Sequence, residues 1–247
     1  MDPLRVIQLG RMAYREAFDL QAEHVEEVIA ARGATAPPDA PSAWGRLLLV
    51  EHDPVVTISR RKGAEANLLA DEAALAAAGV AVEPTDRGGD ITYHGPGQLV
   101  AYPILDLNVL MLRLHDYMRL LEQSVIDTLA VFGVEGRRDP EATGVWVELH
   151  RHQSSAPPGR LAKIAAMGVR VRRWVSMHGL SLNVDPDPAH FRLIVPCGLA
   201  GRPVTSLRAL LGDDCPPMER VSAELVRHLH ANLAAAAARA AAHRTPT

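Results

Sequence analysis

Hydrophobic side chains recur every three or four residues in three stretches of the chain, a spacing that is typical of an amphipathic helix. The stretches cover residues 13–31, residues 114–129 and a third run that begins near Met218. Gly33 is suited to end the first helix, because glycine readily adopts the left-handed conformation found at helix ends. The glycine and prolines of residues 33–45 then predict a loop.

Two shorter helices are predicted by their capping residues. Asp71 is suited to begin a helix that stops at Gly79, and Thr205 is suited to begin another that stops at Gly212. Side-chain oxygens at such positions accept hydrogen bonds from the free N–H groups of the first helical turn.

Apolar runs and alternating apolar positions predict short strands between these helices. The strands cover 47–50, 55–58, 80–85, two stretches within 91–107, 144–149, 169–177, 180–184 and 191–195. The His-Asp-Pro turn that follows the first strand indicates that the first two strands pair with each other. The mixture of strands and helices, without a clear linker, predicts an α/β (α+β) fold that forms a single domain over residues 1–247, with mixed β-sheets flanked by helices.

Composition narrows the class of protein. Apolar residues make up 48% of the chain and its net charge is −3, so there is no basic excess to favour nucleic acid as a partner. We found neither a signal-peptide pattern nor an apolar run of membrane-spanning length, and we therefore expect a cytoplasmic protein that does not bind membranes. Its two cysteines do not make a disulfide framework, which also favours a reducing compartment.

Lysine is used only twice among the 26 basic residues, at Lys62 and Lys163. Lys62 belongs to a charged run that is typical of a solvated loop, whereas Lys163 has apolar neighbours on both sides. Arginine cannot lose its proton in a protein and a partly buried lysine can. Lys163 is therefore a candidate for chemistry that requires a lysine.

Several common catalytic signatures are absent from the sequence. Neither lysine fits a phosphate-binding loop, and the segment from Gly95 has Val100 where the dinucleotide fingerprint requires glycine. The zinc protease and serine hydrolase motifs do not occur. His150 and His152 flank Arg151 and are compatible with a metal pair, but the polar residues 151–160 favour an exposed loop.

The two cysteines differ in their surroundings. A reactive cysteine needs a stabilised thiolate, and Asp213 and Asp214 next to Cys215 disfavour one. Cys197 has no carboxylate close in sequence and lies between Pro196 and Gly198, at the predicted end of a strand. It is therefore the better candidate nucleophile, although a buried apolar role is the commoner one for a free cysteine.

Residues 87–98 are unusually dense in glycine and in polar side chains. A glycine-rich backbone before a strand can offer N–H groups to a ligand, and the same pattern is also compatible with a hairpin loop that contains turn glycines.

From Arg87 to Tyr102 the chain resembles the signature R-G-G-x-x-T-aromatic-H-x-x-G-Q-x-x-x-Y of the lipoyl/octanoyl transferases, and every fixed position matches. Lys163-Ile-Ala-Ala-Met-Gly168, the segment from Trp174 to Val184 and Pro196-Cys-Gly-Leu199 resemble three further motifs of that family, in family order. The four motifs lie within residues 45–212, and the polar insert near 150–160 departs from the family pattern. The resemblance implies the fold of the biotin/lipoate protein ligase superfamily.

The resemblance also implies roles for individual residues. Cys197 would be the nucleophile and Lys163 its partner, in a covalent transfer of octanoyl groups that needs neither ATP nor metal. The expected donor is octanoyl-acyl carrier protein, and the expected acceptors are lipoyl domains of 2-oxoacid dehydrogenase E2 subunits and the glycine cleavage H protein; we expect a monomer. The implied substrate-binding residues are Arg87, Gly88, Gly89, Asp90, Ile91, Thr92, Tyr93, His94, Ala166, Met167, Gly168, Gly179, Leu180 and Ser181.

Three other functions remain open from the sequence. An ATP-dependent lipoate or biotin ligase would require ATP and has no nucleophilic cysteine. A cysteine hydrolase, with His94 or His178 as its base, would lose the acyl chain to water without an acceptor. A non-catalytic module that binds acyl carrier or lipoyl domains would show no turnover.

Overall fold

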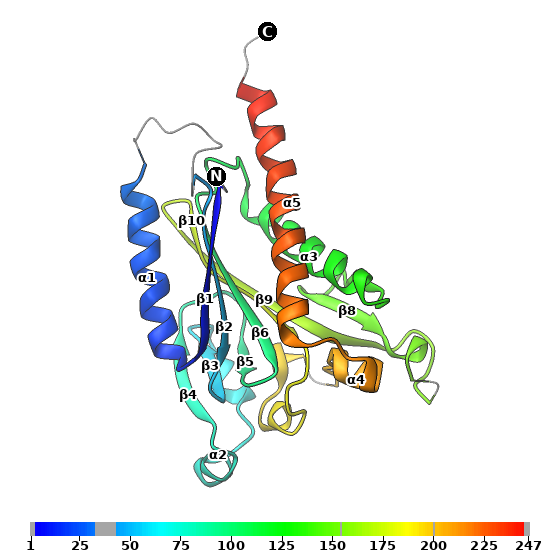
Figure 1. The fold of residues 1–247 in the computed structure, drawn as a ribbon. Coiled ribbons are helices and arrows are strands. Elements are labelled where there is room, and N and C mark those ends of the chain that lie inside the picture. Colours follow the sequence, from blue (N-terminus) through cyan, green and yellow to red (C-terminus); the bar gives the residue numbers. More distant parts are fainter. Residues whose placement is uncertain (1–2, 33–42, 154, 200, 245–247) are drawn as a thin grey trace.

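The computed structural model describes residues 3–32, 43–153, 155–199 and 201–244. Its strands form two mixed sheets, a seven-stranded sheet in the order β1-β2-β6-β10-β9-β8-β7 and a three-stranded sheet in the order β4-β3-β5 (Figure 1). The pairs β1–β2 and β3–β4 are parallel and the other neighbours are antiparallel. These mixed sheets with flanking helices confirm the predicted fold class.

The strands are β1 (Leu4–Met12), β2 (Gly45–His52), β3 (Val55–Ser59), β4 (Ala81–Thr85), β5 (Ile91–His94), β6 (Gln98–Leu105), β7 (Gly136–Arg138), β8 (Val145–Glu148), β9 (Leu161–Arg172) and β10 (Val175–Asn183). The α-helices are α1 (Tyr14–Ala30), α2 (Glu72–Ala78), α3 (Leu114–Val131), α4 (Leu207–Leu211) and α5 (Met218–Arg244). The short 3-10 helices are η1 (Ala64–Asn67), η2 (Leu149–Arg151), η3 (His190–Leu193), η4 (Pro196–Gly198) and η5 (Gly212–Asp214).

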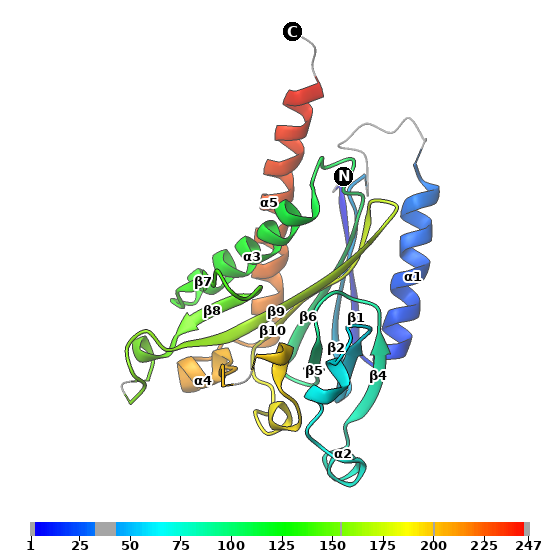
Figure 2. The ribbon, with the colours of Figure 1, turned by 180° about the vertical axis from the view of Figure 1, so that it is seen from behind.

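Both faces of the seven-stranded sheet are covered by helices (Figures 1 and 2). Successive side chains of a strand point to opposite faces, so Leu47 and Leu49 of β2 join the core under α3 and α5. Leu48 and Val50 join the core under α1 on the other face. The β2 run is therefore continuously apolar because both of its faces are buried.

The three long helices lie where their hydrophobic periodicity predicts them. Val221, Leu225, Leu229 and Leu233 of α5 are all fully buried, which is the result expected for a stripe with a spacing of four residues. Residues 33–42, which include the predicted helix end at Gly33 and most of the predicted loop, lie outside the described residues.

The N-cap of α2 is the one that the sequence predicts. The carboxylate of Asp71 accepts a hydrogen bond of 2.8 Å from the N–H of Ala74, and Gly79 ends the helix with a φ of 63°. We expect Asp71→Ala to lower the free energy of unfolding by about 1 kcal/mol, because the cap is lost. Urea denaturation would measure this, with Asp71→Asn as the control that keeps a capping oxygen; equal losses in the two variants would contradict the capping role.

The predicted pairing of strands 47–50 and 55–58 is wrong. The chain leaves the seven-stranded sheet after β2, and β3 instead pairs with β4 and β5 in the three-stranded sheet. The N–H of Asp53 donates to the carbonyl of Met12 at 3.2 Å, so the turn after β2 is bonded to β1 rather than closing a hairpin.

The glycine-rich residues 87–98 likewise do not form a hairpin, since β5 and β6 belong to different sheets. Gly97, with a φ of 81°, makes the change of direction between them, and its carbonyl accepts the N–H groups of Val184 and Asp185. The segment therefore connects the small sheet to the centre of the large one.

Three other boundaries differ from the predictions. The predicted strand 169–177 is interrupted by a turn at Arg173 and Trp174, which joins β9 to β10, and both residues have positive φ values. Residues 191–195 form most of η3 and one isolated bridge between Ile194 and Leu68, instead of a strand. Ser206 rather than Thr205 caps α4, by accepting from the N–H of Ala209.

Candidate active site

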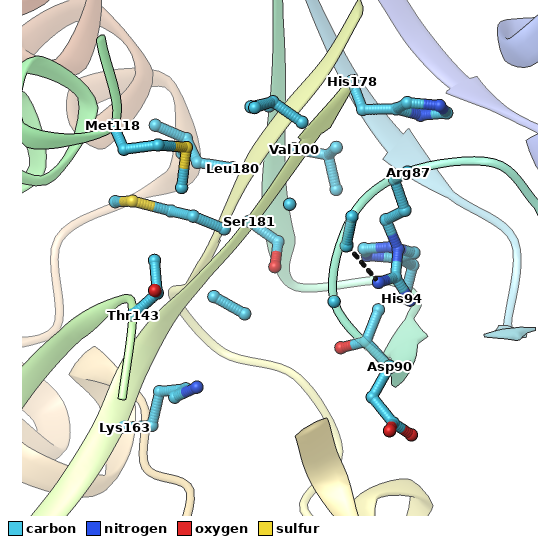
Figure 3. Close-up of a pocket in the computed structure, with 18 of the residues that line it drawn as sticks. Arg87, Asp90, His94, Val100, Met118, Thr143, Lys163, His178, Leu180 and Ser181 are labelled. Atoms are coloured by element: carbon cyan, nitrogen blue, oxygen red, sulfur yellow. Dashed lines mark hydrogen bonds between the residues drawn. The ribbon is translucent and has the colours of Figure 1, made fainter. Parts of the chain in front are cut away.

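A cavity of about 400 Å³ opens beside β9 and β10, between α3 and the loop that precedes β5 (Figure 3). Every implied substrate-binding residue except Ile91 and Tyr93 lines it. These lining residues are Arg87, Gly88, Gly89, Asp90, Thr92, His94, Ala166, Met167, Gly168, Gly179, Leu180 and Ser181.

Ile91 and Tyr93 point away from the cavity, because alternate residues of β5 face opposite sides of the small sheet. Both are fully buried in a separate apolar cluster with Val56 and Ile194. The hydroxyl of Tyr93 lies 2.7 Å from Nδ1 of His190, which ties β5 to η3. These two side chains therefore support the wall from behind.

The loop before β5 is fixed by its own polar groups. Arg87 donates to the carbonyl and the hydroxyl of Thr57, each at 3.0 Å, and the N–H of Gly88 donates to the carbonyl of Val169 at 3.0 Å. Gly168 has to be glycine, since a Cβ there would come within 2.6 Å of the Gly88 carbonyl oxygen. The loop thus lies directly against β9 and forms one wall of the cavity.

Lys163 lies on β9 near the lower end of the cavity in Figure 3 and is 6% exposed. Its ammonium nitrogen is 4.9 Å from the ring centroid of Trp146, which is within the range of a cation–π contact. The backbone of Lys163 bonds to Pro203 and Thr205, the segment that follows the cysteine turn, at 2.9 Å each. The fold therefore brings this segment back to the lysine.

Cys197 belongs to a single 3-10 turn, η4, and does not follow a strand as predicted. Its side chain lies outside the described part of the structure, whereas the turn itself is described. The N–H of Val195, just before the turn, donates to the carbonyl of Asn67 at 2.7 Å, and Gly198 has a φ of 66°.

The two neighbours of this turn border the same space as Lys163. Leu199 lines the large cavity, and Pro196 lines a small adjoining one; Lys163 lines both. The lysine and the cysteine-bearing turn, which are far apart in sequence, therefore meet at one place.

Cys215 lies elsewhere, beside β10 and α4. Burial raises the pKa of the Cys215 thiol, and Asp185 adds to this effect, while Arg208 opposes it. The sulfur is 3.7 Å from the carbonyl oxygens of Val184 and Pro216. The structure thus agrees with the expected unreactive character, but burial and Asp185 disfavour the thiolate rather than Asp213 and Asp214.

Aromatic and imidazole rings close the cavity on the side of α1. Tyr14, His94, Tyr102 and His178 line it, and His52 lies behind them. Several of their polar atoms are bonded to neighbours: Tyr14 donates to Thr85 at 2.7 Å, Tyr102 lies 2.7 Å from His52, and His178 lies 2.8 Å from Asp86. A wall in which these polar atoms are paired can face an apolar ligand at a smaller cost than one with unpaired groups.

Burial keeps these imidazoles neutral. It lowers the pKa of His52 to about 4 and that of His94 to about 3, and it also lowers the pKa of His178, against the opposing effect of Asp86. The Nδ1–H of His94 donates to the Gln98 side-chain oxygen at 2.7 Å, which fits a neutral ring.

These depressed pKa values predict that acid destabilises the fold. Below the ordinary histidine pKa of 6.5 the unfolded chain binds protons that folded His52 and His94 do not, so stability falls as the pH falls toward 4. Each residue should contribute up to about 1.4 kcal/mol per pH unit. Urea unfolding at several values between about pH 7 and pH 5 would give the slope.

The matched variants are His52→Gln, which should flatten this slope, and His115→Gln, which should not, because the His115 side chain is 75% exposed. An unchanged slope in His52→Gln would show that His52 takes up its proton equally in both states.

Several lining residues were not among the predicted site residues. Leu114 and Met118 reach the cavity from α3, and Thr143 reaches it from the loop before β8. Tyr102, also a lining residue, is the last fixed position of the signature, so the sequence did contain a signal for it. In the sequence, Leu114 and Met118 only contribute to the hydrophobic spacing that predicts the helix over 114–129.

Among the described residues, no cluster of histidine, cysteine, aspartate and glutamate could hold a metal ion. His150 bonds through Nδ1 to the carbonyl of Ala156 at 3.0 Å, within the polar loop. In the same part of the chain, no helix combines the length and apolarity that crossing a membrane requires.

The fold has close counterparts among solved structures. A bi-partite lipoate protein ligase from Thermoplasma acidophilum superposes with a TM-score of 0.65 at 16% identity, over 95% of this chain and 85% of that one. A lipoate-protein ligase A bound with ATP gives a TM-score of 0.65 at 16% identity, over 95% and 86% of the two chains. The protein therefore has the fold of the lipoate protein ligases.

Sequence comparison then gives the family. Residues 13–230 match the lipoyl protein ligase A/B catalytic domain. An octanoyltransferase of Flavobacterium johnsoniae is 41% identical over 92% of this chain and 94% of its own, and one of Solibacter usitatus is 47% identical over 82% and 81%. The chain belongs to the lipoyl protein ligase A/B catalytic domain family.

Proposed function

We propose that this protein is an octanoyltransferase, an acyltransferase of lipoate biosynthesis that moves an octanoyl group from acyl carrier protein to a lysine of a lipoyl domain. The observation that carries the proposal is the meeting of buried Lys163 with the cysteine-bearing turn at one cavity. The relatives named octanoyltransferase support the same reaction. Residues 1–247 would act as one catalytic domain, with the motifs within 45–212.

In the first step the Cys197 thiolate attacks the carbonyl carbon of the carrier thioester. The bond from that carbon to the carrier sulfur breaks, and the departing sulfur takes a proton from the Lys163 ammonium. One thioester replaces another, so the exchange is close to thermoneutral and needs no ATP.

In the second step the acceptor lysine attacks the Cys197 thioester. The acceptor arrives as an ammonium ion: neutral Lys163 takes one of its protons, the resulting amine attacks, a second proton passes to water, and the electron pair of the broken C–S bond returns to sulfur. The products are an amide and the starting Cys197 thiolate with protonated Lys163. Conversion of a thioester to an amide is downhill and drives the cycle.

The cavity supports an apolar substrate. It is lined by Val100, Met118, Met167 and Leu180, together with the aromatic and imidazole rings on the side of α1. Burial of each methylene contributes about 0.8 kcal/mol, so the depth of the cavity can select the length of the acyl chain.

Intact mass spectrometry tests the proposal against its rivals. The protein is mixed with octanoyl-acyl carrier protein without ATP, and an apo lipoyl domain or H protein is then added. A hydroxylamine-sensitive octanoyl adduct that moves to the acceptor is expected. Absence of the adduct together with ATP-dependent transfer would establish a ligase, and rapid loss of the adduct to water would establish a hydrolase. No turnover of any kind would leave a binding module.

A further inference from the structure

Asp90 places a buried carboxylate beside the cysteine-bearing turn. It is 6% exposed and lines the cavity. A Cβ built on Gly198, the residue after Cys197, would lie 3.4 Å from Oδ2 of Asp90. The carboxylate thus lies next to the turn that carries the proposed acyl group.

The two oxygens of Asp90 have different partners. Oδ1 accepts hydrogen bonds from the Asn67 side chain and from the N–H of Ile91, each at 2.8 Å. Oδ2 lies 3.5 Å from the Arg61 guanidinium, whose side chain is 66% exposed. An ion pair to a partner this exposed contributes little stability, so Oδ2 can exchange Arg61 for another cation at the cavity.

Lys163 and Asp90 stand on opposite walls of the cavity in Figure 3, with Lys163 on β9 and Asp90 on the loop before β5. The cysteine-bearing turn lies between these two walls. Pro196 lines the small cavity together with Lys163, and Gly198 lies beside Asp90. The acyl group would therefore sit between the Lys163 side chain and the Asp90 carboxylate.

A carboxylate at this place disfavours the Cys197 thiolate, because like charges repel. It does not help the first step of the proposed reaction. The second step differs, because the acceptor lysine arrives as an ammonium ion and must enter a largely apolar site. A fixed carboxylate beside the thioester compensates for the water that this ammonium loses.

We propose that Asp90 binds the ammonium group of the acceptor lysine through Oδ2 and holds it beside the Cys197 thioester. This inference rests on the proposed function and assigns a step within it. The bound ammonium gives one proton to neutral Lys163, and the resulting amine attacks the thioester carbon, with the second proton passing to water.

The two half-reactions separate this role from a structural one. Asp90→Asn keeps an oxygen that can accept from Asn67 and Ile91 but removes the charge. We expect octanoyl adduct formation from octanoyl-acyl carrier protein not to fall, because loss of the charge removes the repulsion of the Cys197 thiolate. Transfer from the adduct to the lipoyl domain should lose about 10- to 100-fold in kcat/KM, as expected for one hydrogen bond to a charged group. The loss should appear mainly in KM for the acceptor.

Two controls complete the experiment. Glu65→Gln removes an exposed carboxylate from η1, the element that also carries Asn67, and should leave both half-reactions unchanged. Release of the acyl group by hydroxylamine, which is uncharged at neutral pH, should proceed equally from the wild-type and Asp90→Asn adducts.

Equal losses in both half-reactions of Asp90→Asn would show that Asp90 only positions the turn, and unchanged transfer would show that it contacts no acceptor charge. Either result would overturn the inference while leaving the transferase function intact. Failure of the wild-type protein to form any adduct would instead refute the proposed function.

Discussion

Cys197→Ala is expected to form no octanoyl adduct and to lose acyl transfer on the order of 10⁴-fold or more, because none of the described side chains that line the cavity carries another thiol. Intact mass spectrometry after incubation with octanoyl-acyl carrier protein measures the adduct, and transfer to an apo lipoyl domain measures turnover. Thermal unfolding of the variant checks that a loss of transfer does not come from a loss of the fold.

Cys215→Ala is the matched control for this result. Burial raises the pKa of the Cys215 thiol, and the sulfur lies against the carbonyl oxygens of Val184 and Pro216, away from the cavity. The variant should keep the adduct and near-normal turnover. If Cys197→Ala still formed the adduct and Cys215→Ala did not, the nucleophile would be Cys215 and the assignment to Cys197 would be wrong.

The helices of this fold could be predicted from the sequence because their signals are local. The spacing of Val221, Leu225, Leu229 and Leu233 defines the buried face of α5, and Asp71 caps α2 through its own side chain. Each of these signals depends on residues within a few turns of one another, so nothing distant is needed to interpret them.

The strand arrangement could not be predicted in the same way. β1 is an edge strand with many half-exposed and exposed residues, so it lacks the apolar run that identifies a buried strand. The turn at Arg173 and Trp174 contains neither glycine nor asparagine, the usual residues at positive φ, and β9 and β10 were therefore not separated correctly. Which strands pair is decided by contacts between distant segments.

The candidate site likewise has features that the local sequence predicts and features that depend on the packing of distant segments. Alternation along β5 follows from the sequence, and it places Asp90, Thr92 and His94 on the cavity side and Ile91 and Tyr93 on the other. The entry of Leu114 and Met118 from α3 depends on how that helix lies across β9 and β10, and no local pattern contains this information.

Replacement of Lys163 should also cause a large loss of acyl transfer. Lys163→Arg keeps a positive charge near Cys197, and its guanidinium can still lie over the Trp146 ring, which the lysine nitrogen approaches to 4.9 Å. Arginine does not lose its proton, so it cannot accept one from the acceptor amine. We expect transfer from the preformed adduct to fall by about 10²- to 10⁴-fold, the usual contribution of a general base.

The two half-reactions of Lys163→Arg should respond differently to pH. Rapid-quench measurement of adduct formation should show a smaller loss than transfer, because the retained charge still stabilises the thiolate while the departing carrier thiolate can take its proton from water. Raising the pH should partly restore transfer by supplying neutral acceptor amine from solution. Lys163→Met, which is similar in length and uncharged, should lose both half-reactions. Full transfer activity in Lys163→Arg would mean that another group removes the amine proton and that Lys163 contributes charge alone.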